Sequence, residues 1–354
     1  SFPALFTSAT TGTAPGTEVT GGSPAYARKS VTWAPGTVDG TGYYGRSYFA
    51  SFEHVLGEHR SLRFTASGHK DLDVPRTDRV TVGYGQTEPQ DAKFDYEVQD
   101  RRRFLLAYLD ESEYAFSERA QVRLSFRTYT ERGERQGLGS DTYRFERDEV
   151  ETLGLGVDFQ KALGDNHLLT YGLDLEHDEI DSTRDNLDLT TMVVTPGEGA
   201  FAPNAKYLRS GVFVQDETSF GGFDATLGAR YSYDEYSFDP FDGGPEEEGD
   251  FDALTLSGQV ARQVTETVRV TGTVAQGYRA PNLEDLANEG GFAGGTVIGK
   301  VDLDPEEALT TDLALDWKDG GWRAGGSLFF TRLGDVVGGQ LVGVGGPLVR
   351  GEGT

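Results

Sequence analysis

Residues 152–176 read TLGLGVDFQKALGDNHLLTYGLDLE, and apolar residues occupy every second position on both sides of a short link. They are Leu153, Leu155, Val157 and Phe159 before Gly164-Asp165-Asn166, and Leu169, Tyr171, Leu173 and Leu175 after it. A period of two with one apolar face is typical of a half-buried strand. The stretch therefore predicts two strands joined by a tight turn.

The same pattern recurs along the chain as six pairs of segments. Val122, Leu124 and Phe126 alternate with polar residues, and so do Leu62, Phe64 and Ala66. Several segments are about 14 residues or longer, beyond the roughly 5–6 residues usual for globular strands. We expect about twelve strands, at residues 43–56, 60–69, 101–116, 119–132, 143–162, 166–181, 205–219, 222–236, 251–263, 266–279, 307–318 and 321–334.

The links between the segments have two lengths. Links within a pair contain a few residues, whereas the links between pairs are long and polar, at about residues 70–100, 131–142, 181–204, 237–250 and 279–306. Tight turns at one end and large loops at the other are typical of outer-membrane barrels. The sequence therefore predicts an all-β, antiparallel, up-and-down transmembrane β-barrel.

The two faces of the predicted strands differ in chemistry. Charged residues occur deep within the alternating segments, at Asp158, Asp174, Arg230 and Arg127, which suits strands that face lipid on one side and a polar lumen on the other. Aromatic residues gather toward segment ends, and we expect them to form an interfacial girdle. That group is Tyr231, Tyr233, Tyr236 and Phe238.

Composition narrows the functional classes. The 354 residues include 58 Asp plus Glu and 32 Lys plus Arg, for a net charge of −26. Such an acidic chain argues against a nucleic-acid partner, because phosphate binding requires a basic surface. There is no cysteine, which excludes disulfides and thiolate metal sites. The chain contains no run of about 18 apolar residues, so the sequence predicts no membrane-spanning helix.

The chain is interpreted as a piece of a larger protein. Residues 1–42 are predicted to be an irregular segment or a preceding extracellular loop, and residues 43–354 to be the partial barrel. The residues from Ser1 onward do not have the pattern of a signal peptide, which is expected to have been removed or to lie outside this piece, and the Gly-rich tail from Gly338 to Thr354 is expected to end in a loop.

Two short motifs follow each other near the predicted tenth strand. Tyr278-Arg279-Ala280-Pro281 stands at its end, and Leu303-Asp304-Pro305-Glu306 precedes the next strand. Pro281 to Asn288 is expected to form one helical turn, with Asn282 as its cap.

These motifs resemble the Tyr/Phe-Arg-Ala-Pro box and the Leu-x-Pro-Glu element of TonB-dependent outer-membrane receptors. Val212-Phe213-Val214-Gln215-Asp216-Glu217 is similar to a general receptor pattern. Residues 73–79, followed by Arg101-Arg102-Arg103, and residues 169–182 resemble the haem and haemoglobin branch of that family. The resemblance extends over most of residues 40–335.

The resemblance implies a 22-stranded barrel in the bacterial outer membrane, plugged by an N-terminal domain that is absent here. It implies import of a scarce metal complex, haem or a ferric siderophore, as transported ligand rather than intrinsic cofactor. The implied partners are the TonB energy complex, acting through the missing plug, and a haem, haem protein or siderophore. Outer-membrane lipid and lipopolysaccharide are further implied partners, and Arg101-Arg102-Arg103 is a candidate contact for lipopolysaccharide.

Candidate ligand-binding residues lie mainly in the first motif. Tyr278 offers an oxygen that can hold haem iron, or a ring that packs at the rim. Arg279 either pairs with lumenal acids or steers an anionic ligand, because guanidinium binds carboxylate in a fork. Asn282 and Arg76 complete the ligand-binding candidates.

Histidine supplies the metal candidates. Haem receptors of this kind carry a ligating histidine between the two motifs, but residues 282–303 contain none. His69 and His177, expected toward the extracellular side, remain as candidates, each weighed against an ordinary surface role.

Three functional classes remain open from the sequence. The first is a TonB-dependent importer, the second a plugless porin or autotransporter barrel, and the third a soluble β-rich binding module. No catalytic arrangement such as G-x-S-x-G is present, so an enzyme is not predicted.

Overall fold

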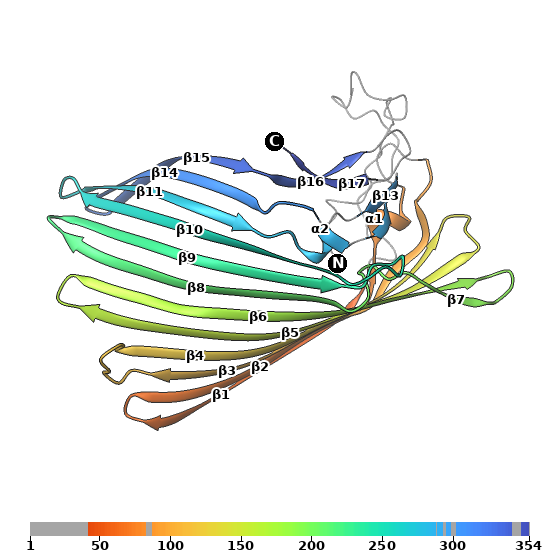
Figure 1. Ribbon diagram of the computed structural model, residues 1–354, viewed down its shortest axis with the longest axis horizontal. Coiled ribbons are helices and arrows are strands. Elements are labelled where there is room, and N and C mark those ends of the chain that lie inside the picture. Colours follow the sequence, from red (N-terminus) through yellow and green to blue (C-terminus); the bar gives the residue numbers. More distant parts are fainter. Residues whose placement is uncertain are drawn as a thin grey trace, which may run out of the picture.

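The computed structural model describes residues 42–82, 87–287, 289–292, 295–298, 302–341 and 348–353. A 13-stranded sheet dominates these residues (Figure 1). Its strands follow the order β1-β2-β3-β4-β5-β6-β8-β9-β10-β11-β14-β15, with β7 added beside β6. Among the described residues, no helix is long and apolar enough to cross a membrane.

The strands of this sheet and the two helices have the following bounds: β1 Tyr44–Gly57, β2 Arg60–Pro75, α1 Thr77–Val80, β3 Asp91–Asp110, β4 Arg119–Gly137, β5 Thr142–Leu163, β6 His167–Asp188, β7 Val194–Gly197, β8 Ala205–Phe220, β9 Phe223–Phe238, β10 Glu247–Gln263, β11 Val268–Arg279, α2 Leu283–Ala287, β14 Glu306–Asp319 and β15 Trp322–Gly334. A second, 4-stranded sheet has the order β12-β13-β17-β16. Its strands are β12 Glu289–Phe292, β13 Gly295–Ile298, β16 Val336–Leu341 and β17 Leu348–Gly353.

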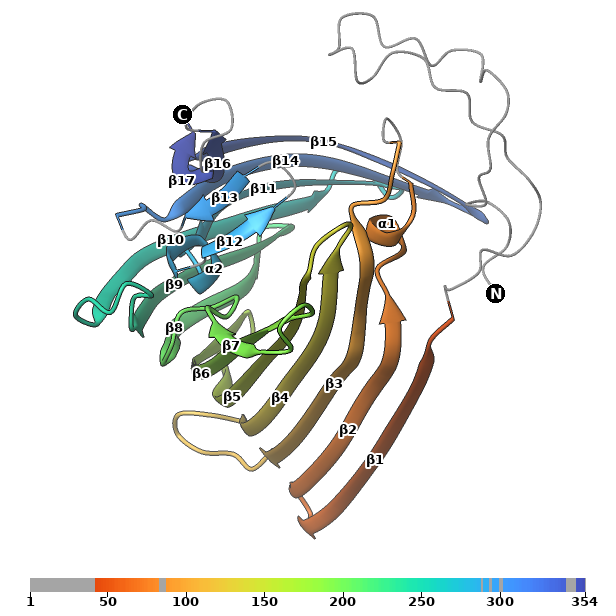
Figure 2. The same ribbon diagram turned by 90° about the vertical axis from the view of Figure 1, so that its right-hand side faces the viewer.

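The predicted fold class is confirmed. Each of the twelve predicted strands corresponds to one strand along the path of the large sheet, and neighbouring strands along that path pair antiparallel. The sheet curves into an open arc with β1 and β15 at its edges (Figure 2). It is therefore an up-and-down barrel wall that is not closed within the described residues.

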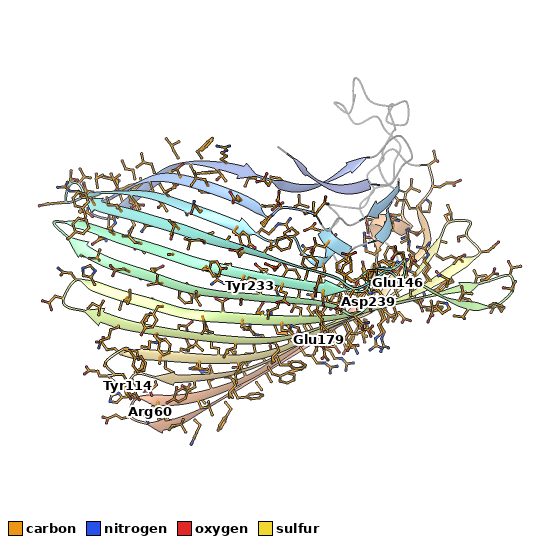
Figure 3. All side chains as sticks on the ribbon, viewed as in Figure 1. Arg60, Tyr114, Glu146, Glu179, Tyr233 and Asp239 are labelled. Carbon is orange, nitrogen blue, oxygen red and sulfur yellow. The ribbon has the colours of Figure 1, made fainter. Side chains whose placement is uncertain are left out.

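The two ends of the wall differ as the link lengths predicted. Gly221 and Gly222 alone connect β8 to β9, and both have positive φ, as a two-residue hairpin turn with the twist of the strands requires. Figure 3 shows Arg60 and Tyr114 at the end that holds the short turns, and Glu146 and Asp239 toward the opposite end. Strands β5 and β6 have 22 residues each, about twice the 9–11 residues that cross a bilayer.

Successive side chains alternate between two faces. We call the concave face that carries α2 the inner face, and the opposite one the outer face (Figure 2). Outer-face Leu153 is 58% exposed, whereas its neighbour Thr152 on the inner face is only 7% exposed. Exposed apolar side chains continue along neighbouring strands, at Leu173, Val212, Leu227, Leu254 and Leu313. The apolar rows therefore do not pack against one another in a dry core.

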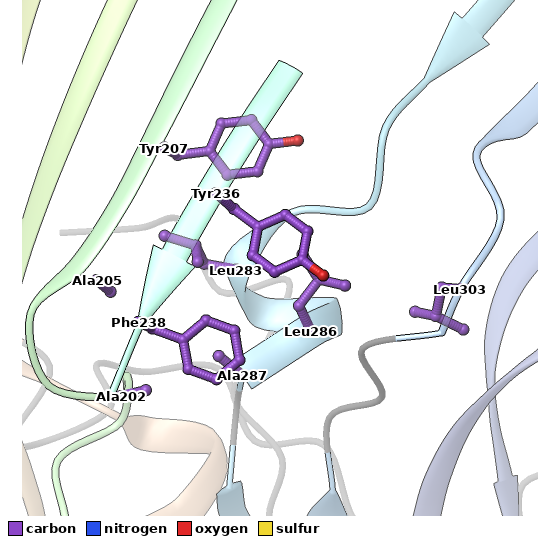
Figure 4. Packing of buried hydrophobic residues seen from close by; sticks show 9 residues of the cluster. All are labelled: Ala202, Ala205, Tyr207, Tyr236, Phe238, Leu283, Leu286, Ala287 and Leu303. Carbon is purple, nitrogen blue, oxygen red and sulfur yellow. The ribbon is translucent and has the colours of Figure 1, made fainter. Parts of the chain in front are cut away.

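A small buried cluster lies where α2 meets the inner face (Figure 4). It contains Ala202, Ala205, Tyr207, Tyr236, Phe238, Leu283, Leu286, Ala287 and Leu303. The expected aromatic girdle is therefore wrong for Tyr236 and Phe238, which are 5% and 4% exposed. Their even positions match the inner-face Arg230 and Asp234, whereas Tyr231 and Tyr233 have the parity of the outer face.

Several links differ from the predictions. Strand β3 ends at Asp110, so residues 111–118 form the link to β4, which is longer than predicted. The Gly-rich tail, expected to end in a loop, contributes most of β16 and all of β17, because backbone pairing does not depend on side chains. Residues 1–41 of the predicted irregular segment lie outside the described residues.

Candidate functional site

The Tyr-Arg-Ala-Pro motif turns the chain from β11 into α2. Asn282 accepts a hydrogen bond from the Asp285 backbone N–H through Oδ1 at 3.0 Å, and the Asp285 carboxylate accepts one from the Asn282 N–H at 3.3 Å. This reciprocal pair is a capping box, and it confirms the helical turn capped by Asn282. The buried hydroxyl of Tyr207 donates to the Pro281 carbonyl at 2.9 Å. The motif is thereby fixed to the wall.

Arg279 joins the two sequence motifs. Its Nε donates to Glu306 Oε2 at 2.7 Å, and its Nη1 donates to Asp285 Oδ2 at 3.0 Å. Glu306 also accepts the Val337 backbone N–H through Oε1 at 2.8 Å. Of the two predicted interpretations of Arg279, pairing with acids of the inner wall is therefore the one seen. Because 43% of its side chain is exposed, Arg279 is also accessible to a ligand.

Tyr278 lies where β11 separates from β10. Pairing of these strands ends at Ser257 and Ala275, and beyond that point the Gln276 side chain accepts the Leu256 backbone N–H at 2.9 Å. The Tyr278 hydroxyl donates to Asp234 Oδ2 at 3.2 Å. Its oxygen is therefore engaged with a carboxylate on β9, inside the wall.

A large concavity of about 900 Å³ follows the inner face from β3 to α2, and we call it the inner recess. Tyr278, Arg279 and Asn282 line it together. Its charged wall residues are Arg103, Arg123, Asp174, Glu176, Asp178, Arg209, Arg230, Asp234 and Glu284. Its size falls within the range of roughly 300–1,000 Å³ usual for small-molecule sites.

Most charges of the inner recess neutralise one another across strands. Arg209 on β8 contacts both Glu176 and Asp178 on β6, at 3.1 and 2.6 Å. Arg230 on β9 holds Asp174 on β6 through two hydrogen bonds of 2.7 and 2.8 Å. Such two-pronged contacts are the strong form of arginine–carboxylate pairing.

Gly211 makes the longer of these pairs possible. Arg230 and Asp174 lie on β9 and β6, with β8 between them. A Cβ at position 211 would collide with the Arg230 guanidinium, so the side chain crosses β8 where a glycine leaves room. A larger residue at this position would therefore displace the Arg230 guanidinium from Asp174, a matter of packing rather than of backbone conformation.

A second concavity, of about 600 Å³, lies on the inner face of β1–β5, and we call it the arginine recess. Its polar lining on the inner face is Ser47, Ser67, His69, Arg101, Arg103, Arg127, Tyr129 and Thr152, and it is bordered by Tyr48, Arg102 and Thr128 from the opposite face of their strands. His69 contacts Ser47 through Nδ1 at 2.7 Å and Asp71 through Nε2 at 2.8 Å. Arg103 lines both recesses, which are therefore contiguous.

Two predicted site residues lie elsewhere. Arg76, next to α1, donates to both carboxylate oxygens of Asp78 at 2.9 Å and holds the pKa of that carboxyl below its usual value. Arg76 lines neither recess. His177 has the outer-face parity of Leu175 and contacts Glu179 at 3.4 Å. Within the described part of the chain, no three His, Cys, Asp or Glu side chains gather in a way that holds a metal ion.

Sequence reasoning missed the residues that make up most of the inner recess. Arg209, Asp178 and Glu176 were not singled out, although each has the parity of the inner face in its own strand. Strand alternation was a sufficient signal for their orientation. Their pairing required the register between strands, which the sequence does not give directly.

A comparison with protein families shows to which family the chain belongs. A family model described as "TonB dependent receptor-like, beta-barrel" matches residues 7–349. The chain belongs to the TonB-dependent receptor family. The family resemblance of the Tyr-Arg-Ala-Pro and Leu-x-Pro-Glu motifs is thereby confirmed, whereas the haem branch stays a prediction.

One curated relative and several solved structures are similar to this chain. The "Iron-regulated outer membrane virulence protein" of Vibrio cholerae serotype O1 is 24% identical over 212 residues, which is 56% of this chain and 29% of the relative. The "Copper transporter OprC" has a TM-score of 0.69 at 13% identity, covering 88% of this chain and 48% of that structure.

Receptors for iron and haem carriers share the same fold. The FrpB iron transporter of Neisseria meningitidis matches with a TM-score of 0.66 at 18% identity, over 90% of this chain and 49% of that one. The Serratia marcescens hemophore receptor HasR, solved with its hemophore HasA and heme, matches at 0.67 and 12%, over 88% and 50%. The chain thus spans about half the length of these structures.

Proposed function

We propose that this chain is the barrel part of an outer-membrane receptor that imports a scarce, anionic metal complex, with haem or a ferric siderophore as the substrate. Family membership supports a TonB-dependent importer. The observation that carries the choice of ligand is the inner recess, which is large enough for a small chelate and is lined by Tyr278 and by Arg103, an arginine without a carboxylate partner among the described residues.

The ligand would enter at the end of the wall that holds the long links. There residues of α2 line the inner recess beside Tyr278 and Arg279, and Arg279 also contacts Glu306 of the motif that follows. Arginine suits carboxylate groups, since its planar fork matches their geometry. The relatives named above transport copper or iron or receive a haem carrier, which supports a metal complex without selecting one.

Energy for uptake would come from the inner-membrane TonB complex, acting through a plug inside the barrel. This step is carried by family membership and not by any residue described here. The chain covers about half of each related structure, so the plug and its coupling belong to the proposal.

Uptake and binding together test this function. A strain that lacks the gene is expected to lose growth on haemin or on ferric citrate as sole iron source, and the complete gene should restore it. Titration of the purified complete receptor with each iron complex is expected to saturate at one equivalent. Normal growth of the deletion strain on both sources, with no binding by the receptor, would exclude the proposal.

Conductance separates an importer from an open pore. In planar bilayers the complete receptor is expected to conduct little current, because a plug blocks the lumen. A large, permanently open conductance together with uptake that needs no TonB would instead favour the porin alternative.

A further inference from the structure

The arginine recess has a charge opposite to that of the chain. The whole protein carries a net charge of −26, yet the inner-face side chains that line this recess include three arginines and a histidine and no Asp or Glu, whereas Arg102 borders it from the opposite face of β3. Random placement would bring acids into such a lining, because acids outnumber bases by 58 to 32. The recess is therefore a local positive potential in an acidic protein.

Three of the five basic groups already have partners. Arg127 pairs with Glu176 at 2.6 Å, and Arg102 pairs with Asp100 at 2.7 Å. His69 contacts Asp71 at 2.8 Å. These contacts leave Arg101 and Arg103, both exposed, as the groups without a carboxylate partner among the described residues.

Arg101 and Arg103 share the inner face of β3. Alternate residues of a strand lie on the same side, about 7 Å apart along the chain. The Arg101 guanidinium stands over the ring of Tyr129, 5.2 Å from its centroid, and this contact orients the group without neutralising it. The Tyr129 hydroxyl is itself committed to Glu131 at 2.5 Å.

The inner recess provides the contrast. There Arg209 and Arg230 are each held by carboxylates of β6, so their donors serve the wall itself. Arg103 also borders this recess, but no carboxylate of the wall holds its guanidinium among the described residues. A ligand in the inner recess that extends toward β3 would meet two guanidinium groups that have no carboxylate partner among the described residues.

We propose that Arg101 and Arg103 form a subsite that binds the carboxylate groups of the imported complex, while the remainder of that complex occupies the inner recess. This inference rests on the proposed function and adds the chemical class of the ligand: a chelate that carries at least one free carboxylate. Each guanidinium binds one carboxylate through parallel N–H···O hydrogen bonds.

Haemin and its dimethyl ester are the probes that test this subsite. They share the iron porphyrin, but only haemin carries carboxylates. The complete receptor with Arg101→Gln and Arg103→Gln is expected to bind haemin about ten- to a hundredfold more weakly, the loss typical of charge-assisted hydrogen bonds. Its affinity for the ester should stay at the wild-type value. Ferric citrate, titrated in parallel, should follow haemin.

Arg102→Gln is the matched control. It removes the same charge one residue away, from the outer face, and should leave haemin affinity unchanged. A variant with Arg101→Lys and Arg103→Lys keeps the charge without the planar fork and should bind with intermediate affinity. Heat-modifiable electrophoretic mobility shows whether each variant is folded, and we expect all to be, since these side chains are exposed.

The possible results separate the two proposals. If the wild-type receptor binds neither haemin nor ferric citrate, the proposed function fails and the subsite with it. If the wild type binds and the double Gln variant binds equally well, only the subsite is overturned. A rise in bilayer conductance of that variant at unchanged haemin affinity would also overturn it, because the two arginines would then seal the lumen against another part of the receptor.

Discussion

A single ion pair connects the two motifs by which the sequence resembles its family. Arg279 belongs to the first and Glu306 to the second, 27 positions further along the chain. The same carboxylate accepts the Val337 N–H from β16. The pair therefore fixes the ends of β11 and β14 and the start of the second sheet at one point. Neither motif alone predicted this contact, because it depends on the antiparallel register of β11 and β14.

The coupling between these two residues is measurable. We expect Arg279→Gln, Glu306→Gln and the double variant to show a coupling free energy of about 0.5–1 kcal/mol in urea unfolding of the detergent-solubilised receptor, as for partly exposed pairs. Glutamine at 306 retains an oxygen for the Val337 N–H, so the cycle isolates the charges. Glu307→Gln, next in sequence but on the opposite face, is the control and should not couple to position 279.

At the scale of elements, the strands were predictable and the helix–wall contact was not. Alternation alone located every long strand, because each strand has a row of apolar side chains on one face and a row of polar ones on the other. The short α2 was recognisable from Asn282 followed by Asp285, the capping pattern. Its docking onto Tyr207, Tyr236 and Phe238 was not, since it depends on two strands and two loops that are distant from one another in sequence.

The docking of α2 is expected to depend more on Leu286 than on its cap. Leu286 is 2% exposed within the cluster, and truncation to alanine should cost about 2–5 kcal/mol, as for other buried leucines. Loss of the cap in Asn282→Ala should cost about 1 kcal/mol. Amide hydrogen exchange of residues 283–287 measures both effects. Asn282→Asp keeps a capping oxygen, and unprotected amides in that variant would show that the cap has another role.

At the scale of the whole molecule, the distribution of apolar surface argues against one of the classes that the sequence left open, the soluble module. A soluble module would hide its apolar rows, yet here they cover the outer face while ion pairs line the inner one. Composition could not show this, since alternation averages the two faces into an unremarkable mean hydropathy of −0.46. The ligand remained beyond prediction because the charges of the wall cancel in pairs that only the strand register reveals.

Charge placed on either face of one strand should therefore have very different effects. Leu313 on β14 is 56% exposed on the outer face, six residues from the short turn, and Asp312 beside it faces inward. Leu313→Arg should destabilise the bilayer-embedded receptor by about 2–4 kcal/mol, the cost of arginine near the midplane. Asp312→Arg adds the same side chain at the same depth and should cost less than 1 kcal/mol by the same measure. Unfolding of both variants from lipid vesicles, followed by heat-modifiable electrophoretic mobility, measures these free energies. An equal loss of stability in the two variants would show that the outer face does not contact acyl chains.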